Sequence, residues 1–455
     1  MNARPLLAAA VVVLCPAFAG ADEPSVVRPN VLLIVSDDQG VNDVGCYGSE
    51  IPTPALDALA AEGLKFEQFY AASSICTPSR FGLLTGRFAH RSADALTGAL
   101  MFLDPADAQR GLRADETTFV SLLKKNGYRT HLVGKWHLGH GTIGEGGGKF
   151  WPTEHGFDTF FGHTGGCVDF FTCRYGNVPD WYRGEELVPT DAYATDVITD
   201  EAVALIRGGK RDESEPWFLE VAYNAPHYGK GWDEPANRTR NVMQPKPADL
   251  EKVTRLGSRI ENPLRRAFAA KVVGMDAGIA RLLDALEESG QAEDTLVIFM
   301  SDHGGDPDYG GSNAPLRGEK ATLYEGGVRV PCLVRWPGVV QPGATTDAVA
   351  TALDWFPTFA DLGLLEDAPT NLDGQSIAPL LRGEPLPKHV PIVWATGSHA
   401  ELDRAAWVAV RDGDWKWVRH KGDEALFDLA ADPRETTNRL ADRPEIAARL
   451  RALAD

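Results

Sequence analysis

Four short runs of apolar residues stand out along the chain, and polar residues follow each of them directly. The runs are NVLLIVS before Asp37-Asp38, RTHLV before Gly134–His137, WFLEVAY before Asn224–His227 and LVIFMS before Asp302-His303. Continuous aliphatic and β-branched runs without alternation are typical of strands that are buried on both faces of a largely parallel sheet. The pattern therefore predicts four such strands, each ending in polar side chains.

The segments between these runs have apolar residues at spacings of three and four. TPALDALAAEGL, DETTFVSLLKKNGY and AAKVVGMDAGIARLLDALEESG show this spacing and stop at glycine or asparagine-glycine, which predicts helices. Alternating strands and helices indicate a doubly wound α/β domain. Because ligands gather at the carboxyl ends of the strands in such sheets, the four polar clusters are expected to form one shared site.

The character of the sequence changes after about Leu381, where short, aromatic and turn-rich stretches begin. PIVWAT, AAWVAVRDGDWKWVRH and EALFDLAAD predict a small antiparallel sheet, and residues 443–454 predict a closing helix. We therefore expect a large domain over residues 22–383 and a small α+β subdomain over residues 384–455.

The first 21 residues have the features of a signal peptide. Arg4 supplies a positive charge, Leu6–Leu14 an apolar stretch, and AFA or AGA a cleavage site of small residues. This predicts export to the periplasm or the medium. Cys15 would also allow a lipoprotein, but Leu14 before it fits that processing site poorly. No later segment has a long uninterrupted apolar run, so no transmembrane helix is expected.

The charge of the chain narrows the classes of partner. The formal net charge is −19 at pH 7. An acidic surface argues against a nucleic-acid-binding protein and repels polyanions at long range. An anionic substrate must therefore meet a locally basic pocket. Six cysteines in 455 residues are too few for a disulfide scaffold.

Two pairs of chelating residues at predicted strand ends suggest a metal site. Adjacent acids such as Asp37 and Asp38 can simply cap the next helix, and the same holds for Asp302 beside His303. Two such pairs on one sheet favour a metal instead. Three carboxylates suit a hard divalent cation, Ca²⁺ or Mg²⁺. His303 would suit a softer ion, but the carboxylates outnumber it.

Cys76 lies in the stretch SSICTPSRFGLLTGR, where Pro78 fits the first position of a helix. The cysteine is then at a helix N-terminus, whose free amides favour negative charge, so a nucleophilic thiolate is one interpretation. A buried apolar thiol and half of a disulfide are the other two. A thiolate is, however, poorly suited to cleaving a sulfate or phosphate ester.

Basic residues and histidines also lie beside the predicted strand ends. Three cations converging on a dianionic tetrahedral group would supply the stabilisation that sulfuryl or phosphoryl transfer needs, although each alone is more typical of a solvated surface. His137 and His227 offer proton transfer near neutral pH. The basic candidates are Arg80, Lys135, Arg317, Lys320 and Arg329.

Several of these motifs together resemble the type I sulfatases. CTPSRFGLLTGR matches their signature C-x-P-S-R-x-x-L-x-T-G-R, and GYRTHLVGKWHLG matches their second signature, G-Y-x-T-x-x-x-G-K-x-H-L-G. NVLLIVSDDQGVNDVGCYG, YNAPH, APLRGEKATLYEGGVRVP and DWFPT occur in the family's order. The likeness extends from about Asn30 to LFDLAADPRETTNRL near the C-terminus.

This resemblance implies an alkaline-phosphatase-like fold and a sulfuric ester hydrolase. It implies that a maturation enzyme oxidises Cys76 to formylglycine, whose hydrated diol attacks the sulfate ester. It also implies a divalent metal, Ca²⁺ or Mg²⁺, although many members carry Asp-Asn at the position of Asp302-His303. The implied metal ligands are Asp37, Asp38, Asp302, His303 and the modified Cys76.

The resemblance implies roles for the basic residues as well. Arg80 and Lys135 hold the diol, and His137 takes a proton from its second hydroxyl. Lys135, His227 and Lys320 contact the sulfate. Whether His227 or Lys320 protonates the leaving alkoxide stays open.

Export and an aromatic stretch favour a sulfated saccharide as the substrate. The aromatic candidates, which either stack on sugar rings or pack in the core, are Phe170, Phe171, Trp181 and Tyr182. Cys167 and Cys173 either form a disulfide there or stay free. Two other functions are open: a phosphonate monoester or phosphodiester hydrolase with the same formylglycine, and a catalytically silent protein that binds sulfated glycans.

Overall fold

The structure, a computed structural model, describes residues 28–140, 150–208, 215–255, 260–397 and 406–454. The predicted signal peptide and Cys15 lie outside the described residues. The centre of the structure is an 11-stranded mixed sheet, counted over the described residues. Five neighbouring strands are parallel: β12 (Thr295–Ser301), β1 (Asn30–Asp37), β9 (Trp217–Pro226), β3 (Arg129–Lys135) and β4 (Thr159–His163).

The strands at the two edges complete the sheet. On one side they are β13 (Arg329–Arg335), β2 (Leu64–Tyr70), β14 (Ala344–Thr346) and β15 (Ala350–Thr351). On the other side they are β7 (Tyr182–Arg183) and β8 (Glu186–Leu187). β13 runs antiparallel to both β12 and β2, so the sheet is mostly parallel only at its centre. Two small hairpins lie outside it: β5 (Arg174–Tyr175) with β6 (Val178–Pro179), and β10 (Gly229–Asp233) with β11 (Arg238–Val242).

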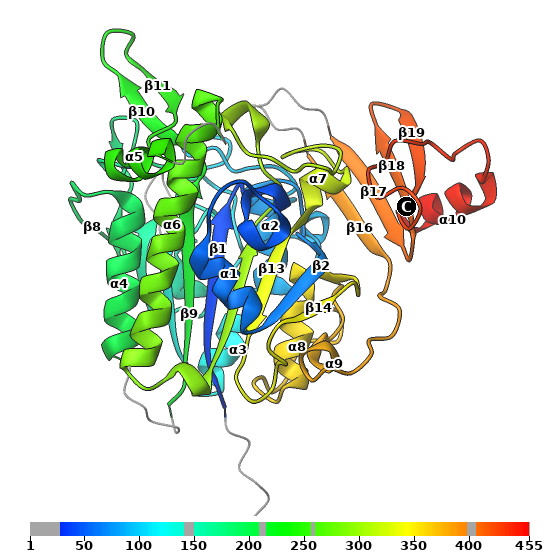
Figure 1. Cartoon of the computed structure of the whole chain (residues 1–455), viewed down its shortest axis with the longest axis horizontal. Coiled ribbons are helices and arrows are strands. Elements are labelled where there is room, and N and C mark those ends of the chain that lie inside the picture. Colours follow the sequence, from blue (N-terminus) through cyan, green and yellow to red (C-terminus); the bar gives the residue numbers. More distant parts are fainter. Residues whose placement is uncertain (1–27, 141–149, 209–214, 256–259, 398–405, 455) are drawn as a thin grey trace, which may run out of the picture.

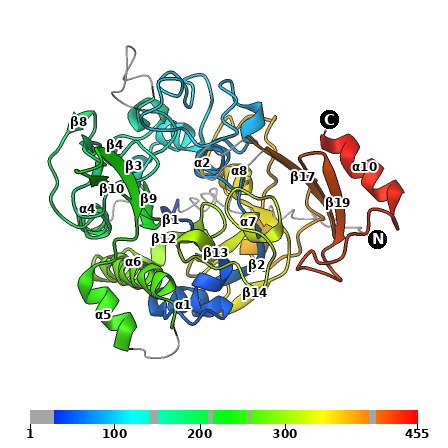
Figure 2. The same cartoon turned by 90° about the horizontal axis from the view of Figure 1, so that it is seen from above.

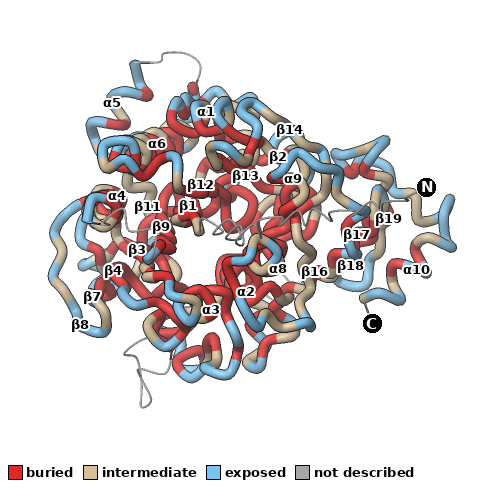
Figure 3. The backbone as a smooth tube through the Cα atoms, turned by 90° about the horizontal axis from the view of Figure 1, so that it is seen from below, coloured by how far each residue is buried: buried red, intermediate tan, exposed pale blue. Residues whose placement is uncertain are grey.

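Helices cover both faces of this sheet (Figure 1). Alternate residues of β1 belong to two different cores, because successive side chains of a strand point to opposite faces. Leu32 and Ile34 pack with α1 (Pro54–Ala61), α4 (Ala194–Gly208) and α6 (Pro263–Glu288). Val31, Leu33 and Val35 pack with α2 (Cys76–Thr85), α3 (Phe119–Lys125) and α8 (Trp355–Asp361). Buried positions follow the central strands throughout (Figure 3). The other α-helices before the C-terminal sheet, within the described residues, are α5 (Pro247–Arg255), α7 (Glu325–Val328) and α9 (Ala378–Leu381).

The predicted strands and helices are confirmed, with one correction at Cys76. Helix α2 begins at Cys76 itself, so Pro78 is the third helical residue rather than the first. Proline is tolerated there because the N–H groups of the first turn have no partner within the helix. The cysteine therefore still lies at the N-terminus of a helix.

The C-terminal residues form a separate antiparallel sheet and a closing helix, as predicted. The sheet contains β16 (Ile392–Thr396), β17 (Trp407–Asp412), β18 (Trp415–His420) and β19 (Asp423–Asp428), followed by α10 (Pro444–Ala454). The boundary at residues 383 and 384 stays a prediction. No helix in the described ranges is both long and apolar enough to cross a bilayer.

Trp394 of β16 joins this C-terminal sheet to the main core. It is 1% exposed, and its indole N–H donates to the carbonyl of Ala71 at 2.9 Å. Its ring packs on Tyr70 of β2, with centroids 5.7 Å apart. Replacing Trp394 by alanine should therefore lower the free energy of unfolding by about 3–5 kcal/mol, measured by urea denaturation.

The half-buried Trp232 on the β10–β11 hairpin provides the matched control for this prediction. Trp232→Ala should cost about 1 kcal/mol or less, because it leaves no core cavity. Equal losses for Trp232→Ala and Trp394→Ala would show that Trp394 does not anchor the C-terminal sheet.

Candidate active site

The carboxyl ends of the central strands bring the predicted residues to one place. Asp37 is the last residue of β1, and Asp302 follows β12 directly. The pairing of Ser36 with Ser301 continues into a hydrogen bond from the Asp302 amide to the Ser36 carbonyl, 3.0 Å long. The two acidic pairs therefore lie side by side, as strand ends in one parallel register must.

A tight set of potential metal ligands surrounds Cys76. One ligand atom from each of Asp37, Cys76, Asp302 and His303 lies within 4.8 Å of the others, and a second such set contains Asp37, Asp38, Cys76 and His227. The Cys76 Sγ is 3.1 Å from His303 Nε2 and 3.7 Å from Asp37 Oδ1. All of these residues are buried. The two sets share Asp37 and Cys76, and together they contain three carboxylates, two imidazoles and one thiol.

The electrostatics of this set favour a positive charge at its centre. Burial raises the pKa of Asp37 well above its ordinary value, and the neighbouring Asp302 raises it further. Burial likewise raises the pKa of Asp38 to about 6. Burial alone would lower the pKa of His303, but Asp302 and Cys76 outweigh it and raise the value to about 10. A divalent cation bound here would likewise stabilise the ionised carboxylates.

Three cations neutralise the carboxylates from the other side. Lys135 Nζ is 2.8 Å from Asp37 Oδ2, and an Arg80 terminal nitrogen is 3.0 Å from Asp302 Oδ2. Lys320 Nζ is 2.7 and 2.9 Å from the two oxygens of Asp38. These cations are at most 2% exposed. Each acid is thus matched by a base from a different part of the chain.

Cys76 lies among these cations at the first position of α2. Burial alone would raise the pKa of its thiol, but Lys135, Lys320 and His303 lower it well below the ordinary value. An anion at this position is therefore stabilised. Arg80, one helical turn further on, donates to the Lys135 carbonyl at 3.2 Å and so ties α2 to the end of β3.

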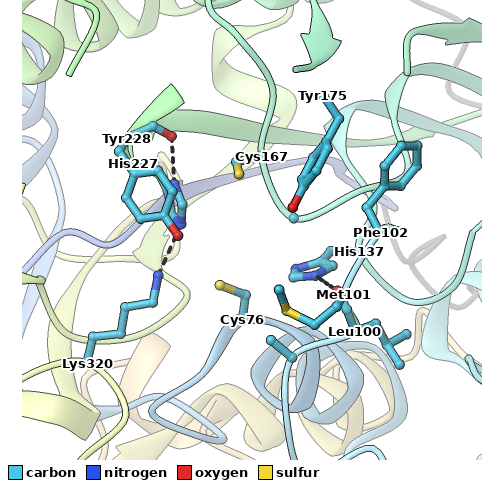
Figure 4. A pocket seen from close by; sticks show the side chains of 12 residues that line it. Cys76, Leu100, Met101, Phe102, His137, Cys167, Tyr175, His227, Tyr228 and Lys320 are labelled. Carbon is cyan, nitrogen blue, oxygen red and sulfur yellow. Dashed lines mark hydrogen bonds between the residues drawn. The ribbon is translucent and has the colours of Figure 1, made fainter. Parts of the chain in front are cut away.

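Hydrogen bonds to backbone carbonyls fix the tautomers of both histidines. His137 Nε2 lies 2.9 Å from the Leu100 carbonyl, which can only accept, so Nε2 carries the proton and Nδ1 is the basic nitrogen. In the same way His227 Nδ1, 2.8 Å from the Tyr228 carbonyl, is the donor. His227 Nε2 is then the acceptor for Lys320 Nζ at 3.1 Å. The side chains converge on one hollow (Figure 4).

Both histidines are poised as neutral groups. Burial lowers the pKa of His227 well below its ordinary value, and Lys320 and Lys135 lower it further. Burial and then Lys135 also lower the pKa of His137. Asp38 and His137 have positive φ angles of 66° and 55°, a conformation that non-glycine residues adopt mainly where the surrounding structure enforces it.

Some predicted candidates do not reach this site. Arg317 lies over the Tyr324 ring, 3.9 Å from its centroid, and Arg329 donates to the Glu67 carbonyl at 2.8 Å. Neither joins Arg80, Lys135 and Lys320. Cys167 and Cys173 do not form a disulfide with each other.

The aromatic residues proposed to stack on sugars are mostly core residues. Phe170 is fully buried, and Trp181 and Tyr182 are 2% and 1% exposed. Only Phe171 is exposed, and it packs on Tyr193 with ring centroids 5.2 Å apart. For Phe170, Trp181 and Tyr182 the packing alternative is therefore the right one.

Other aromatic residues line the hollow above Cys76. Phe102 and Tyr175 form one wall, with centroids 5.1 Å apart, and Tyr228 forms the opposite wall (Figure 4). None of these three residues was predicted from the sequence. Tyr228 follows His227 directly and could have been found from that neighbour; Phe102 and Tyr175 belong to no motif.

Comparison with known proteins agrees with this geometry. Residues 29–363 match the family model described as Sulfatase, and residues 318–453 match the one described as N-sulphoglucosamine sulphohydrolase, C-terminal. Steryl-sulfatase of Mus musculus is 35% identical over 422 residues, which is 81% of this chain and 67% of that protein. Arylsulfatase A of Homo sapiens is 33% identical over 427 residues, which is 89% of this chain and 77% of that protein.

Solved structures show the same fold. The crystal structure of Ps i-CgsB in complex with k-i-k-neocarrahexaose superposes with a TM-score of 0.80 at 30% identity, covering 94% of this chain and 92% of that one. Family model, relatives and fold agree with the motifs: the chain belongs to the sulfatase family, and the sulfuric ester hydrolase predicted from its sequence is confirmed.

Proposed function

We propose that the enzyme removes sulfate from a sulfated saccharide, using a formylglycine made from Cys76 and a divalent cation. The observation that carries this proposal is the position of Cys76. Its Sγ lies at the base of the hollow, among four metal-binding side chains and beside the pairs that Lys135 and Lys320 make. The oxygen atoms of the modified residue would take the place of that sulfur.

The donor set suits Ca²⁺, with Mg²⁺ as the alternative. Asp37, Asp38 and Asp302 supply oxygen, as hard cations prefer, and His303 adds one nitrogen. A bound cation would polarise a sulfate oxygen and acidify the hydrated aldehyde. His227 lies close enough to be a further ligand of the same cation. Its Nε2 already accepts a hydrogen bond from Lys320, however, so a contact to the sulfate fits His227 better than metal binding does.

The chain's own residues supply the remaining steps. Arg80 and Lys135 stabilise negative charge at position 76, because both cations are close enough to interact with an anion there. A hydrated aldehyde offers one hydroxyl to attack sulfur and a second from which His137 can take a proton. His137 Nδ1 is the unprotonated nitrogen, so this ring is ready to act as a base.

Lys320 is the better candidate for the acid that protonates the leaving group. Lys320 donates to the unprotonated Nε2 of His227 at 3.1 Å. Burial and nearby cations hold the pKa of His227 low, so this ring is neutral and carries no proton to give on that side. The ammonium group of Lys320 does carry one.

A saccharide fits the hollow better than a small sulfate does. Aromatic walls made by Phe102, Tyr175 and Tyr228 provide faces against which a sugar ring can pack. The structure of Ps i-CgsB that covers 94% of this chain is a complex with k-i-k-neocarrahexaose. Export by the predicted signal peptide would bring the enzyme to extracellular polysaccharide.

The aldehyde should be found by mass spectrometry. In protein from a host with a formylglycine-generating maturation enzyme, the tryptic peptide FEQFYAASSICTPSR should appear in the lighter aldehyde form. The peptide VPCLVR, which contains the buried Cys332, should keep its thiol and serves as the control. A plain thiol at Cys76 in fully active protein would refute the proposed nucleophile.

Cys76→Ser should release product once at most, because serine lacks the second hydroxyl.

Replacing Lys320 by alanine should damage catalysis and spare metal binding. Because Lys320 contacts Asp38 and His227 rather than the centre of the metal set, Lys320→Ala should lower kcat at least about 100-fold. Calcium affinity, measured by calorimetry, should fall far less than kcat, because the ammonium group of Lys320 offers the cation no ligand atom. Lys125→Ala, at a side chain that is 60% exposed, should leave both unchanged. Equal loss of rate and affinity would place Lys320 among the metal ligands.

Metal removal should lower thermal stability through the same cluster. At free Ca²⁺ one hundred times its Kd, binding adds about 2.7 kcal/mol to the stability of the folded chain. Chelation should therefore lower the Tm, and His303→Ala should abolish most of that response. The exposed His90 provides the control, and His90→Ala should respond like the unmodified sequence. An unchanged response in His303→Ala would remove His303 from the ligand set.

A further inference from the structure

Two stretches that matched the family by sequence, far apart along the chain, lie against each other in the structure. One is the segment from Arg317 to Glu325, which carries Lys320 and leads into α7. The other is the loop after β19 that contains Glu435. In both views α7 lies between the central strands and the C-terminal sheet (Figures 1 and 2).

Glu435 contacts both ends of the segment that carries Lys320. Its side-chain Oε2 accepts from the backbone N–H of Glu325 at 2.6 Å. Its backbone carbonyl accepts from the guanidinium of Arg317 at 2.9 Å. Glu435 is fully buried and has a positive φ of 53°. A non-glycine residue held in this conformation inside the protein indicates that its surroundings impose the geometry.

The loop itself is built to present Glu435 inwards. Asp432 Oδ2 accepts from the amides of Thr436 and Thr437 at 2.7 and 2.8 Å, which closes a tight turn. Asn438 Oδ1 accepts from the Leu426 amide at 3.0 Å and fixes the loop to β19. The polar residues of DPRETTN thus shape the turn, and Glu435 is the residue that leaves it.

Lys416 of β18 secures the same contact by charge. Its Nζ is 2.8 Å from Glu325 Oε1 and 3.1 Å from Glu435 Oε1, and all three side chains are fully buried. Tyr70 donates to Glu325 Oε2 at 2.6 Å, and Arg411 donates to the Tyr70 hydroxyl. Lys416 is therefore shared by two buried acids across the junction, and its removal would leave both without this partner.

The segment between the two contacts has little room to move. The Gly326 amide donates to the Arg317 carbonyl at 2.7 Å and closes the segment into a loop. A Cβ on Gly326 would lie 2.4 Å from the Gly318 carbonyl oxygen, and one on Gly327 would lie 2.0 Å from that of Thr322. Packing this dense transmits displacement rather than absorbing it.

Three backbone hydrogen bonds tie the Arg317–Glu325 segment and α7 to the active site. The Lys320 amide donates to the Gly305 carbonyl at 3.2 Å, and the Ala321 amide donates to the Ser74 carbonyl at 2.8 Å. The Gly304 amide, next to His303, donates to the Gly327 carbonyl at 3.0 Å. A shift of either end of the loop would therefore move Lys320 relative to Asp38.

We infer that Glu435 of the C-terminal subdomain is a positioning residue for Lys320. It holds both ends of the Arg317–Glu325 segment, with Lys416 as its charge partner, and so sets where the ammonium group of Lys320 lies above Cys76. This inference rests on the catalytic role proposed for Lys320. A junction that only stabilised the fold would affect folding but would not act through that lysine.

A double-mutant cycle with the matured full-length enzyme tests this difference. The four proteins are the unmodified sequence, Glu435→Ala, Lys320→Ala and the double variant, assayed for sulfate release from an aryl sulfate with enzyme in excess. Glu435→Ala alone should lower kcat/KM about 10- to 100-fold, the cost of a small misplacement of a catalytic group. In the Lys320→Ala background the same change should cost about threefold or less, because residues that act through one another are not additive.

Two further variants control for stability. Glu424 is in the same subdomain and pairs with Arg451 near the surface, so Glu424→Ala should leave kcat/KM within about twofold. Glu435→Gln keeps an oxygen that can accept from Glu325, so it should recover most of the activity that Glu435→Ala loses. If Glu435→Ala does not fold, a variant that carries both Glu435→Gln and Lys416→Met takes its place in the cycle.

The outcomes separate this inference from the proposed function. An equal loss from Glu435→Ala in both backgrounds, or no loss in either, would overturn the positioning role. Full activity of Lys320→Ala would instead overturn the role proposed for Lys320. Absence of sulfate release by the unmodified matured enzyme, from an aryl sulfate and from sulfated saccharides alike, would overturn the proposed function itself.

Discussion

The burial of three carboxylates at one edge of the sheet is the constraint on which the rest of the structure depends. Asp37, Asp38 and Asp302 are at most 1% exposed, and isolated charges there would be strongly destabilising. Each is matched by a cation that arrives on a separate segment: α2, the end of β3, or the loop before α7. The fold must therefore close around this edge for any of these charges to be tolerated.

The same pairing explains how an acidic protein can act on an anionic ester. The chain carries a net charge of −19, which repels polyanions at a distance but is screened beyond about 10 Å at 0.1 M salt. Inside the hollow the field is set by Lys135, Lys320 and Arg80. Lys135 and Lys320 lower the pKa of Cys76, and Arg80 pairs with the neighbouring Asp302. An anion at position 76 is therefore stabilised.

The sequence predicted the base of the site better than its walls. Asp37 and Asp302 follow buried strands, so the parallel register alone brings them together. The walls depend on side-chain direction in irregular segments, which periodicity does not report. From the sequence, Trp181 could either stack on a sugar or pack in the core, and it is a core residue. Phe102, which belongs to no motif, lines the hollow. The long helices and both sheets could be predicted because their patterns are local.

The division of the chain into domains illustrates what sequence texture cannot show. A change in composition near Leu381 suggested a boundary, yet the two family models overlap over residues 318–363, the region that contains the segment carrying Lys320. The structure offers a physical reason for this overlap. Glu435 and Lys416 lie beyond the compositional change, but their contacts end on Arg317 and Glu325. Lys320 of the large domain, which we propose to be catalytic, is thus enclosed between residues that the small subdomain holds, and the proposed catalytic unit extends across the apparent boundary.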